Sequence, residues 1–222
     1  MGPQKKLIIF ADLEGTLLRD SDKQYDEREM YGFLAQISKI QQAKKLSAEI
    51  HLVSPMTLDI MKGVMDRIDK TIYRYNSIHH AEGKDEVPYI TGATASPEVT
   101  EEDCYLVDDR IMPLPRRYAA LADSSAIEKE HYVKSWLEAL TDRVGMVIYC
   151  GNDMNDLLAM KYVKGLFNGY AICPNNSKDD IKANSDFVGK DDDLVGITEG
   201  LAYILQRFSN KETPTKADDF EK

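Results

Sequence analysis

Two acidic side chains, Asp12 and Glu14, stand one residue apart directly after the apolar run Leu7–Phe10. Further along, the stretch GNDMND places Asp153 and Asp156 after another apolar run. If these acids meet, two like charges roughly 4 Å apart cost about 4 kcal/mol at an effective dielectric near 20. A divalent cation removes that penalty. Mg²⁺ suits the task because it is a hard ion held by one or two carboxylates, water and substrate phosphate.

Short apolar runs alternate with helical patterns along the chain, which is the order of a parallel sheet wrapped by helices. We therefore predict an α/β fold: a doubly wound, Rossmann-like parallel sheet with helices on both faces and a small inserted cap. The predicted strands cover 7–10, 48–53, 71–76, one or two pieces of 104–114, 146–150 and about 170–173. The predicted helices cover 30–40, 58–68, 125–140, a segment from about 155, and 194–208.

Polar side chains follow several of these predicted strands. They are Asp12 and Glu14 after the first strand, Ser54 after AEIHLV, Asn152, Asp153 and Asp156 after MVIYC, and Lys129 at the start of the helix before MVIYC. In an open parallel sheet, ligands bind beyond the carboxyl ends of the strands, where the connecting loops converge. We therefore expect these side chains to form one site.

The composition argues against several classes of partner. The 222 residues carry a formal net charge of -10, whereas a nucleic-acid footprint needs clustered Lys and Arg. No apolar run is long enough to span a bilayer, and the amino-terminal MGPQKK leads into a strand-like run without the apolar region of a signal peptide. The three widely spaced cysteines suit reduced, buried thiols. We expect a cytoplasmic protein that binds neither nucleic acid nor membrane.

The length suits one substantial core with a small accessory module. Regular patterns weaken between about Ile90 and Leu114, where Gly92 and several prolines interrupt them. We expect a core domain over 1–89 and 121–208, a small cap or insertion over 90–120, and a flexible tail over 209–222.

Four segments, in order, resemble the motifs of the haloacid dehalogenase superfamily of hydrolases. DLEGT is similar to the family's first motif, D-x-D-x-T, with Glu in the second acidic slot, and Ser54 matches the second. KEHYVKSWLEAL follows the third motif from Lys129, and GNDMND is similar to the fourth, G-D-x-x-N-D. The resemblance runs from about residue 7 to 205, apart from the middle insertion. It is nearest to the sugar-phosphatase-like branch, which has a cap inserted after the second motif. Each motif alone is weak, but four in order are a strong signal.

The resemblance implies a Mg²⁺-dependent phosphatase that hydrolyses a phosphomonoester, such as a sugar phosphate, through an aspartyl-phosphate. Asp12 would be the nucleophile, and Glu14 would protonate the departing alcohol and then activate water. Ser54 and Lys129 would hold the phosphoryl oxygens. The metal would be bound by the Asp12 carboxylate, the main-chain carbonyl of Glu14 and the fourth motif, where Asn152 and Asp153 are the candidates. Supporting positions would be Gly15, Thr16 and Asp156.

Asn152 departs from the family pattern, because the slot after Gly151 normally holds a metal-binding Asp. An Asn side chain offers a neutral carbonyl oxygen, which can coordinate the ion but adds no charge. Either the affinity for Mg²⁺ falls or the neighbouring Asp153 takes over. Our hypothesis is that Asp153 compensates.

Other functions and roles stay open at this point. The chain could be a catalytically weakened relative that binds a phosphorylated ligand or protein, or a phosphotransferase to an acceptor alcohol. A short cap would leave the site open to larger substrates or close it through homo-oligomerisation. Ser54 could instead cap the next helix, as Thr57 could, and Lys134 competes with Lys129 for the third motif. His79 and His80 are interpreted as loop residues.

Overall fold

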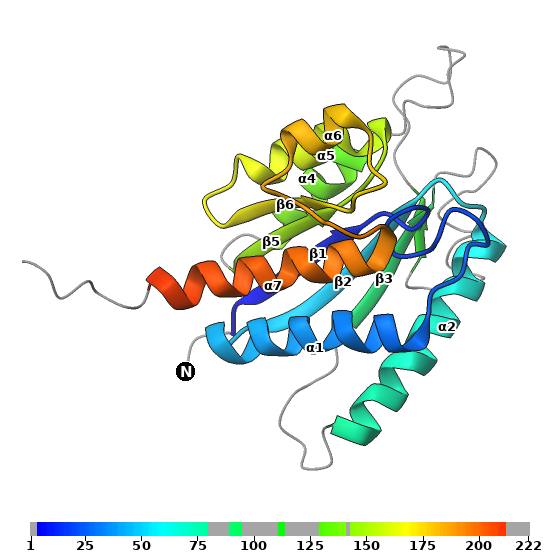
Figure 1. Ribbon diagram of the computed structural model, residues 1–222, viewed down its shortest axis with the longest axis horizontal. Coiled ribbons are helices and arrows are strands. Elements are labelled where there is room, and N and C mark those ends of the chain that lie inside the picture. Colours follow the sequence, from blue (N-terminus) through cyan, green and yellow to red (C-terminus); the bar gives the residue numbers. More distant parts are fainter. Residues whose placement is uncertain (1–3, 80–88, 95–110, 114–128, 141–142, 212–222) are drawn as a thin grey trace, which may run out of the picture.

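The computed structural model describes residues 4–79, 89–94, 111–113, 129–140 and 143–211 (Figure 1). Within them, seven parallel strands form one sheet in the order β4-β3-β2-β1-β5-β6-β7. The strands are β1 (Lys6–Ala11), β2 (Ser47–Ser54), β3 (Tyr89–Thr94), β4 (Ile111–Pro113), β5 (Val144–Cys150), β6 (Gly169–Cys173) and β7 (Phe187–Val188). The helices are α1 (Glu27–Lys44), α2 (Leu58–His79), α4 (Lys129–Leu140), α5 (Leu157–Lys164), α6 (Asp179–Asn184) and α7 (Asp193–Lys211), with a 3₁₀ turn η2 (Met154–Asp156).

The sheet is doubly wound, as predicted. β1 is central and pairs with β2 on one side and β5 on the other. The strands after β1 are added outward on the β2 side as far as β4, and from β5 onward they are added on the opposite side of β1. This is a topological switch point, where ligands bind in open α/β sheets. Helices α1, α2 and α7 pack on one face, and α4, α5 and α6 pack on the other. Among the described helices, none combines the length and apolar character needed to cross a membrane.

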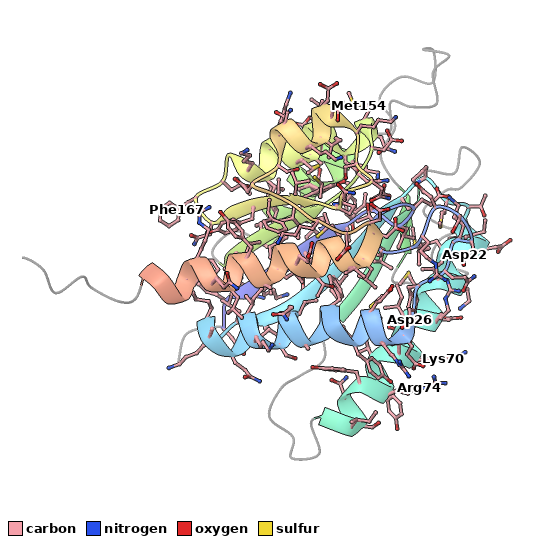
Figure 2. The ribbon with its side chains drawn as sticks, viewed as in Figure 1. Asp22, Asp26, Lys70, Arg74, Met154 and Phe167 are labelled. Atoms are coloured by element: carbon pink, nitrogen blue, oxygen red, sulfur yellow. The ribbon has the colours of Figure 1, made fainter. Side chains whose placement is uncertain are left out.

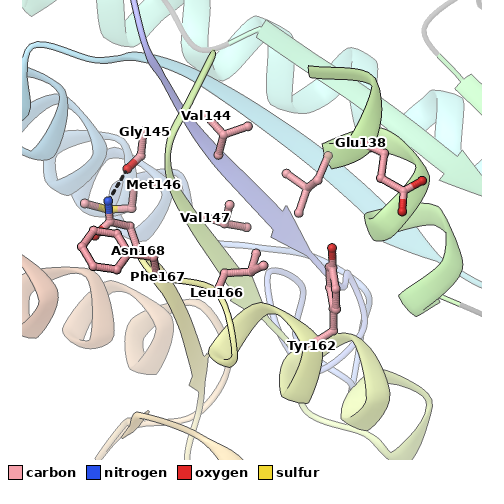
Figure 3. A pocket seen from close by; sticks show the side chains of 10 residues that line it. Glu138, Val144, Gly145, Met146, Val147, Tyr162, Leu166, Phe167 and Asn168 are labelled. Carbon is pink, nitrogen blue, oxygen red and sulfur yellow. Dashed lines mark hydrogen bonds between the residues drawn. The ribbon is translucent and has the colours of Figure 1, made fainter. Parts of the chain in front are cut away.

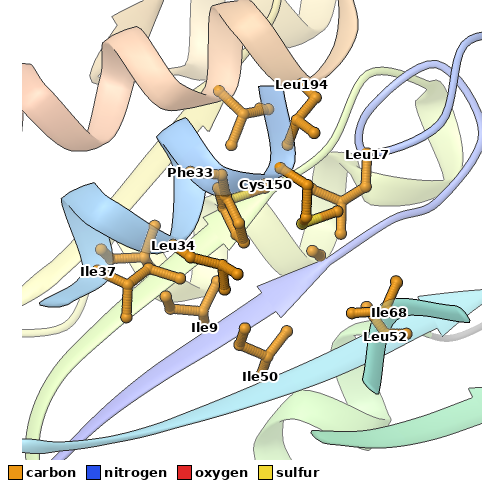
Figure 4. Close-up of a cluster of buried hydrophobic side chains, with 14 of the residues drawn as sticks. Ile9, Leu17, Phe33, Leu34, Ile37, Ile50, Leu52, Ile68, Cys150 and Leu194 are labelled. Atoms are coloured by element: carbon orange, nitrogen blue, oxygen red, sulfur yellow. The ribbon is translucent and has the colours of Figure 1, made fainter. Parts of the chain in front are cut away.

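The residues Leu7–Ala11 of β1 are fully buried because a central parallel strand is covered on both faces. Successive side chains alternate between the faces. Ile9 faces α1, where it belongs to the same buried cluster as Phe33 and Leu34 (Figure 4), whereas Phe10 belongs to the cluster beneath α4 and α5. Full burial of one such side chain contributes about 1.5–3 kcal/mol, so β1 holds both layers together.

Helix α1 confirms the helix predicted over 30–40. Its amino end is capped by the carboxylate of Asp26, which accepts the N–H of Arg28 at 2.7 Å. It ends at Lys45, which adopts a left-handed conformation and donates its N–H to the Gln41 and Gln42 carbonyls. The apolar residues at three- and four-residue steps are buried: Met30, Phe33, Leu34, Ile37 and Ile40.

The strand predicted over 71–76 is wrong, because these residues continue α2. Ile68, Ile72 and Tyr75 are buried and extend the apolar stripe of the helix at three- and four-residue steps. The β-branched and aromatic residues of TIYRYN favoured a strand, but such propensities give way to packing. His79 is the last residue of this helix and not a loop residue, and His80 lies outside the described residues.

The sheet also reaches into the segment 90–120 that was predicted as an inserted cap. β3 pairs with β2 from Tyr89 opposite Glu49 to Thr94 opposite Ser54, and β4 pairs with β3. Residues 90–94 and 111–113 therefore belong to the central sheet, which corrects the predicted boundary at 90. Pro113 is compatible with β4 because, among the described strands, β4 lies at the edge of the sheet. The other residues of 90–120 lie outside the described part of the chain.

The core assignment can be tested with two isoleucines. Ile148 on β5 is fully buried, whereas Ile60 on α2 keeps 52% of its surface exposed. We predict that Ile148→Ala lowers the free energy of unfolding by about 2–5 kcal/mol, because it removes packed atoms and leaves a cavity. Ile60→Ala should change it by less than about 0.5 kcal/mol. Urea unfolding measures both, and equal losses would contradict this core.

Candidate functional site

The candidate site lies at the carboxyl edge of the sheet, where the loops after β1 and β5 begin. The N–H of Asp12 donates to the Cys150 carbonyl at 2.9 Å, which joins the starts of these two loops. Asp12 keeps only 3% of its surface exposed, so its carboxyl group is held inside the protein. The first predicted acid is thus a buried group at the switch point of the sheet.

A buried ammonium group lies between two carboxylates. Nζ of Lys129, the first residue of α4, is 2.9 Å from Oδ1 of Asp12 and 2.7 Å from Oδ1 of Asp156. We call these three residues the charge triad. They are far apart in the sequence, and the structure brings them together as predicted. With both carboxyls ionised, the charge triad carries one negative charge.

Asp156 makes several further hydrogen bonds. Its Oδ1 also accepts from the hydroxyl of Tyr149 at 2.9 Å, and its Oδ2 accepts the N–H groups of Asn152 and Asp153 at 3.0 and 3.1 Å. Buried carboxylates need such partners, because an unpaired buried charge is very unfavourable. Asp156 therefore fixes both the turn after β5 and the ammonium of Lys129.

Burial and the neighbouring Asp156 raise the pKa of Asp12 to about 7, although Lys129 and the N–H of Leu13 oppose the rise. Burial alone would lower the pKa of Lys129, but the two carboxylates outweigh it and raise that pKa. Burial, followed by Asp156, raises the pKa of Tyr149 well above its usual value. At neutral pH, Lys129 is therefore a cation and Tyr149 a neutral donor, and the pKa of Asp12 lies close to the pH.

Ser54 ends β2 at the same edge of the sheet and is fully buried. Leu52 pairs with Ala11, so Ser54 stands two residues beyond the partner of the last residue of β1. Its hydroxyl accepts the N–H of Met56 at 3.3 Å, within its own turn. Ser54 therefore orders the loop that leads to α2.

Gly15 and Thr16 join the loop after β1 to Asn152. Gly15 has a φ of +67°, a left-handed conformation, and a Cβ at this position would collide with the side-chain amide of Asn152. The hydroxyl of Thr16 donates to Oδ1 of Asn152 at 3.3 Å. Gly15 and Thr16 thus join the loop after β1 to Asn152, and their supporting role in a site stays a prediction.

The side chains of the two remaining predicted residues pair with lysines outside the charge triad and are partly exposed. Glu14 has a side chain that is 34% exposed, and its Oε1 lies 2.7 Å from Nζ of Lys23. The carboxylate of Asp153 accepts the N–H of Met154 and lies 2.5 Å from Nζ of Lys178. Although partial burial acts to raise the pKa of Asp153, its bond with Lys178 and the Met154 N–H lower it overall. Asp153 thus faces the loop after β6.

Two residues that follow β6, Asn176 and Lys178, were not predicted from the sequence as part of the site. The side-chain amide of Asn176 donates to the Gly15 carbonyl at 3.1 Å and to Oδ1 of Asp193 at 2.7 Å. The N–H of Lys178 donates to the Asn152 carbonyl at 3.2 Å. The rule that ligands bind beyond strand ends could have found this loop, because ICPNNSK follows a predicted strand at the same edge.

Two hollows in the described part of the chain lie at the amino-terminal ends of the strands, opposite the candidate site. One, of about 330 Å³, is lined by Val144, Val147 and Tyr162 among others (Figure 3). Its neighbour, of about 460 Å³, is lined by Lys44 and Phe208 among others. Both contain residues of the amino end of β5, and neither contains a member of the charge triad. The site is therefore identified by its charges and not by these hollows.

The raised pKa of Asp12 has a consequence for stability in the ion-free protein. Between the ordinary Asp value of 3.8 and about 7, the folded state holds a proton that the unfolded chain has lost. Stability from this group therefore falls as the pH rises through that window. With a chelator present, we predict that Asp12→Asn is more stable than the wild type at pH 8, by a few kcal/mol at about 1.4 kcal/mol per pKa unit. Urea unfolding should give nearly equal free energies of unfolding for the variant and the wild type near pH 4. The same difference between the two proteins at both pH values would refute the raised pKa of Asp12.

No family model matches the sequence, and no curated protein matches it. Among solved structures, a cobalt-bound deoxy-D-mannose-octulosonate 8-phosphate phosphatase from Haemophilus influenzae shares 11% identity over 93% of this chain and 92% of that chain, with a TM-score of 0.46. A haloacid dehalogenase-like hydrolase from Bacteroides thetaiotaomicron shares 16% identity over 90% of this chain and 100% of that chain, with a TM-score of 0.47. Solved structures similar to this chain thus include haloacid dehalogenase-like hydrolases, the family whose motifs the sequence resembles.

Proposed function

We propose that this protein is a Mg²⁺-dependent phosphatase that hydrolyses a phosphomonoester through an aspartyl-phosphate on Asp12. The observation that carries the proposal is the charge triad. A potential nucleophile, Asp12, is held by a buried cation, Lys129, at the switch point of a parallel sheet. Phosphoryl transfer needs little more from a protein than an aligned nucleophile, a proton donor and positive charge around the phosphoryl group.

Asp12 is arranged to offer one oxygen to phosphorus. Among the described residues, both contacts of its carboxylate fall on Oδ1, which accepts from the Leu13 N–H at 2.8 Å and from Lys129. Oδ2 would attack, forming the Oδ2–P bond while the bond from phosphorus to the alcohol oxygen breaks. Because only 3% of Asp12 is exposed, a terminal phosphate that enters end-on fits the site. A small phosphorylated metabolite, such as a sugar phosphate, meets this requirement.

Lys129 and Ser54 would bind the phosphoryl oxygens. An ammonium group has three N–H donors, and the two carboxylates of the charge triad take two of them. The third has no acceptor among the described residues and would bind the transferring group, where negative charge is concentrated. Ser54 would supply its hydroxyl from the neighbouring strand end. Glu14, at the rim, would give its proton to the leaving alcohol and take one from the water that hydrolyses the aspartyl-phosphate.

The residues at this edge fit a Mg²⁺ ion. The charge triad is one positive charge short of neutrality, and Asp12 and Asn152 offer the hard oxygen donors that Mg²⁺ prefers. Across the described residues, no three His, Cys, Asp or Glu side chains are grouped as a metal site, so the main-chain carbonyl of Glu14, water and substrate phosphate would complete the coordination. The ion would add positive charge at the transferring phosphoryl group.

The catalytic proposal makes a direct prediction. Purified protein with Mg²⁺ should release phosphate from some members of a broad phosphomonoester panel, and Asp12→Asn should lower this activity by at least about 10³-fold, because the amide cannot attack phosphorus. The matched control is Asp66→Asn, which changes an exposed carboxylate paired with Lys62 on α2 and should keep full activity.

A wild type that releases no phosphate would contradict the phosphatase. If orthovanadate, a phosphate analogue, still raised its melting temperature, the protein would instead bind phosphorylated ligands, a function that the neutral Asn152 also favours. Transfer to an added acceptor alcohol, with less free phosphate, would indicate a phosphotransferase.

Matched alanine variants can distinguish the roles of Asn152 and Asp153 in binding Mg²⁺. Asp153 would have to leave Lys178 and the Met154 N–H to coordinate an ion, whereas Oδ1 of Asn152 already faces the loop that carries Asp12. We predict that Asn152→Ala raises the Mg²⁺ concentration for half-maximal activity by about tenfold or more, and that Asp153→Ala changes it less than about threefold. Asn152→Asp should lower that concentration, because it adds a negative charge. The reverse order for the alanine variants would support compensation by Asp153.

A further inference from the structure

Lys23 contacts the proposed proton donor Glu14 from the same loop. Its Nζ lies 2.7 Å from Oε1 of Glu14 and 3.7 Å from Oδ1 of Asp20. Nothing in the proposed chemistry accounts for a cation at this place, because Lys129 already serves the phosphoryl group. The contact is therefore informative about Glu14 itself.

The loop after β1 folds back on itself, which brings the side chain of Lys23 to Glu14. A single tight turn comes first, in which the N–H groups of Leu17 and Leu18 donate to the Leu13 carbonyl at 3.0 and 2.8 Å. All three leucines are buried, which ties this turn to the core. The residue Glu14, inside the turn, consequently has a fixed main chain and a side chain at the rim.

A second turn carries Lys23. The N–H of Arg19 donates to the Gln24 carbonyl at 2.8 Å, and the N–H of Lys23 donates to the Arg19 carbonyl at 2.9 Å. Lys23 has a φ of +56°, a left-handed conformation that is uncommon for a residue with a Cβ. The surroundings must hold it there, because such a conformation is unfavourable for lysine in an open chain.

Helix α2 keeps Lys23 in this conformation through Arg67. Arg67 of α2 bonds the side-chain carbonyl of Gln24 and lies 3.4 Å from the main-chain carbonyl of Lys23, and its guanidinium stands over the ring of Tyr25 at 5.2 Å. Asp22 pairs with Arg19 on the outer side of the turn, at the end of the molecule where this loop meets α2 (Figure 2). The main chain of Lys23 is thus fixed on the body of the protein.

We propose that Lys23 is a positioning residue for Glu14, an inference that rests on the proposed phosphatase. The ion pair uses Oε1 of Glu14, which leaves Oε2 to meet the leaving oxygen and, later, water. Glu has three side-chain torsions and loses much rotamer freedom when it is ordered, so a half-exposed Glu without a partner would spend little time in one orientation. Holding a reacting group in the correct orientation itself increases the reaction rate.

The second step shows where Lys23 acts. The oxygen of water attacks phosphorus, the bond between phosphorus and Oδ2 of Asp12 breaks, and one water proton moves to Oε2 of Glu14. Phosphate leaves, and the Asp12 carboxylate is restored. Lys23 touches neither phosphorus nor water in this step. It acts only through the carboxylate that it holds.

The test is a double-mutant cycle on kcat with the full-length protein and one substrate from the panel. Because ion pairs at such exposure are weak, we expect Lys23→Met to lower kcat by about 2- to 5-fold and to leave KM within about twofold. Lys23→Arg should restore most of the loss. In a Glu14→Gln background, Lys23→Met should have no further effect on kcat, because the residue through which it acts is already altered.

The matched control is Lys62→Met, which removes a similarly exposed lysine that pairs with Asp66 on α2. It should leave kcat unchanged. An equal loss of kcat from Lys23→Met in both backgrounds, no loss in either, or the same loss from Lys62→Met would overturn the inference while leaving the phosphatase intact. An inactive wild type would overturn the proposed function and, with it, this role of Lys23.

Discussion

The buried ammonium of Lys129 is the constraint on which the rest of the site depends. A buried charge without partners is far too unfavourable to persist, so Lys129 requires a carboxylate beside it, and Asp12 and Asp156 both contact it. This requirement fixes how α4 sits against the sheet and how the turn after β5 folds. Tyr149 and two main-chain N–H groups then occupy the remaining hydrogen-bonding positions of Asp156. Stability and the proposed chemistry therefore draw on the same contacts.

The loops around the charge triad are also joined to one another. Asn152 contacts Thr16 through its side chain and the loop after β6 through its carbonyl, and Asn176 reaches the Gly15 carbonyl. Loops from three parallel strands thus brace each other at one edge of the sheet. Because β1 is covered by helices on both faces, the site is held by the main core. Such bracing would keep the proposed nucleophile, Asp12, in place without needing contacts from a ligand.

Much of the fold could be predicted from the sequence, because β1, β5 and β6 contain unbroken apolar runs, the segment AEIHLV of β2 is strand-like, and α1 and α7 show a clear helical stripe. The prediction of a strand at 71–76 was wrong because this part of α2 contains β-branched and aromatic residues. Strand β3 was missed because Gly92 weakens its pattern. The meeting of Asp12, Lys129 and Asp156 followed from motif order and strand ends. The partners of Glu14 and Asp153, Lys23 and Lys178, could not be foreseen, because lysines are common and surface ion pairs follow no sequence period.

Asn152 makes physical sense once the surrounding charges are considered. The Asp156 carboxylate accepts the N–H of Asn152, and burial together with Asp156 already raises the pKa of Asp12 to about 7. An Asp at position 152 would place a third carboxylate beside these two, and among the described residues Lys129 is the cation that contacts Asp12 and Asp156. An Asn keeps an oxygen donor for a cation without that repulsion.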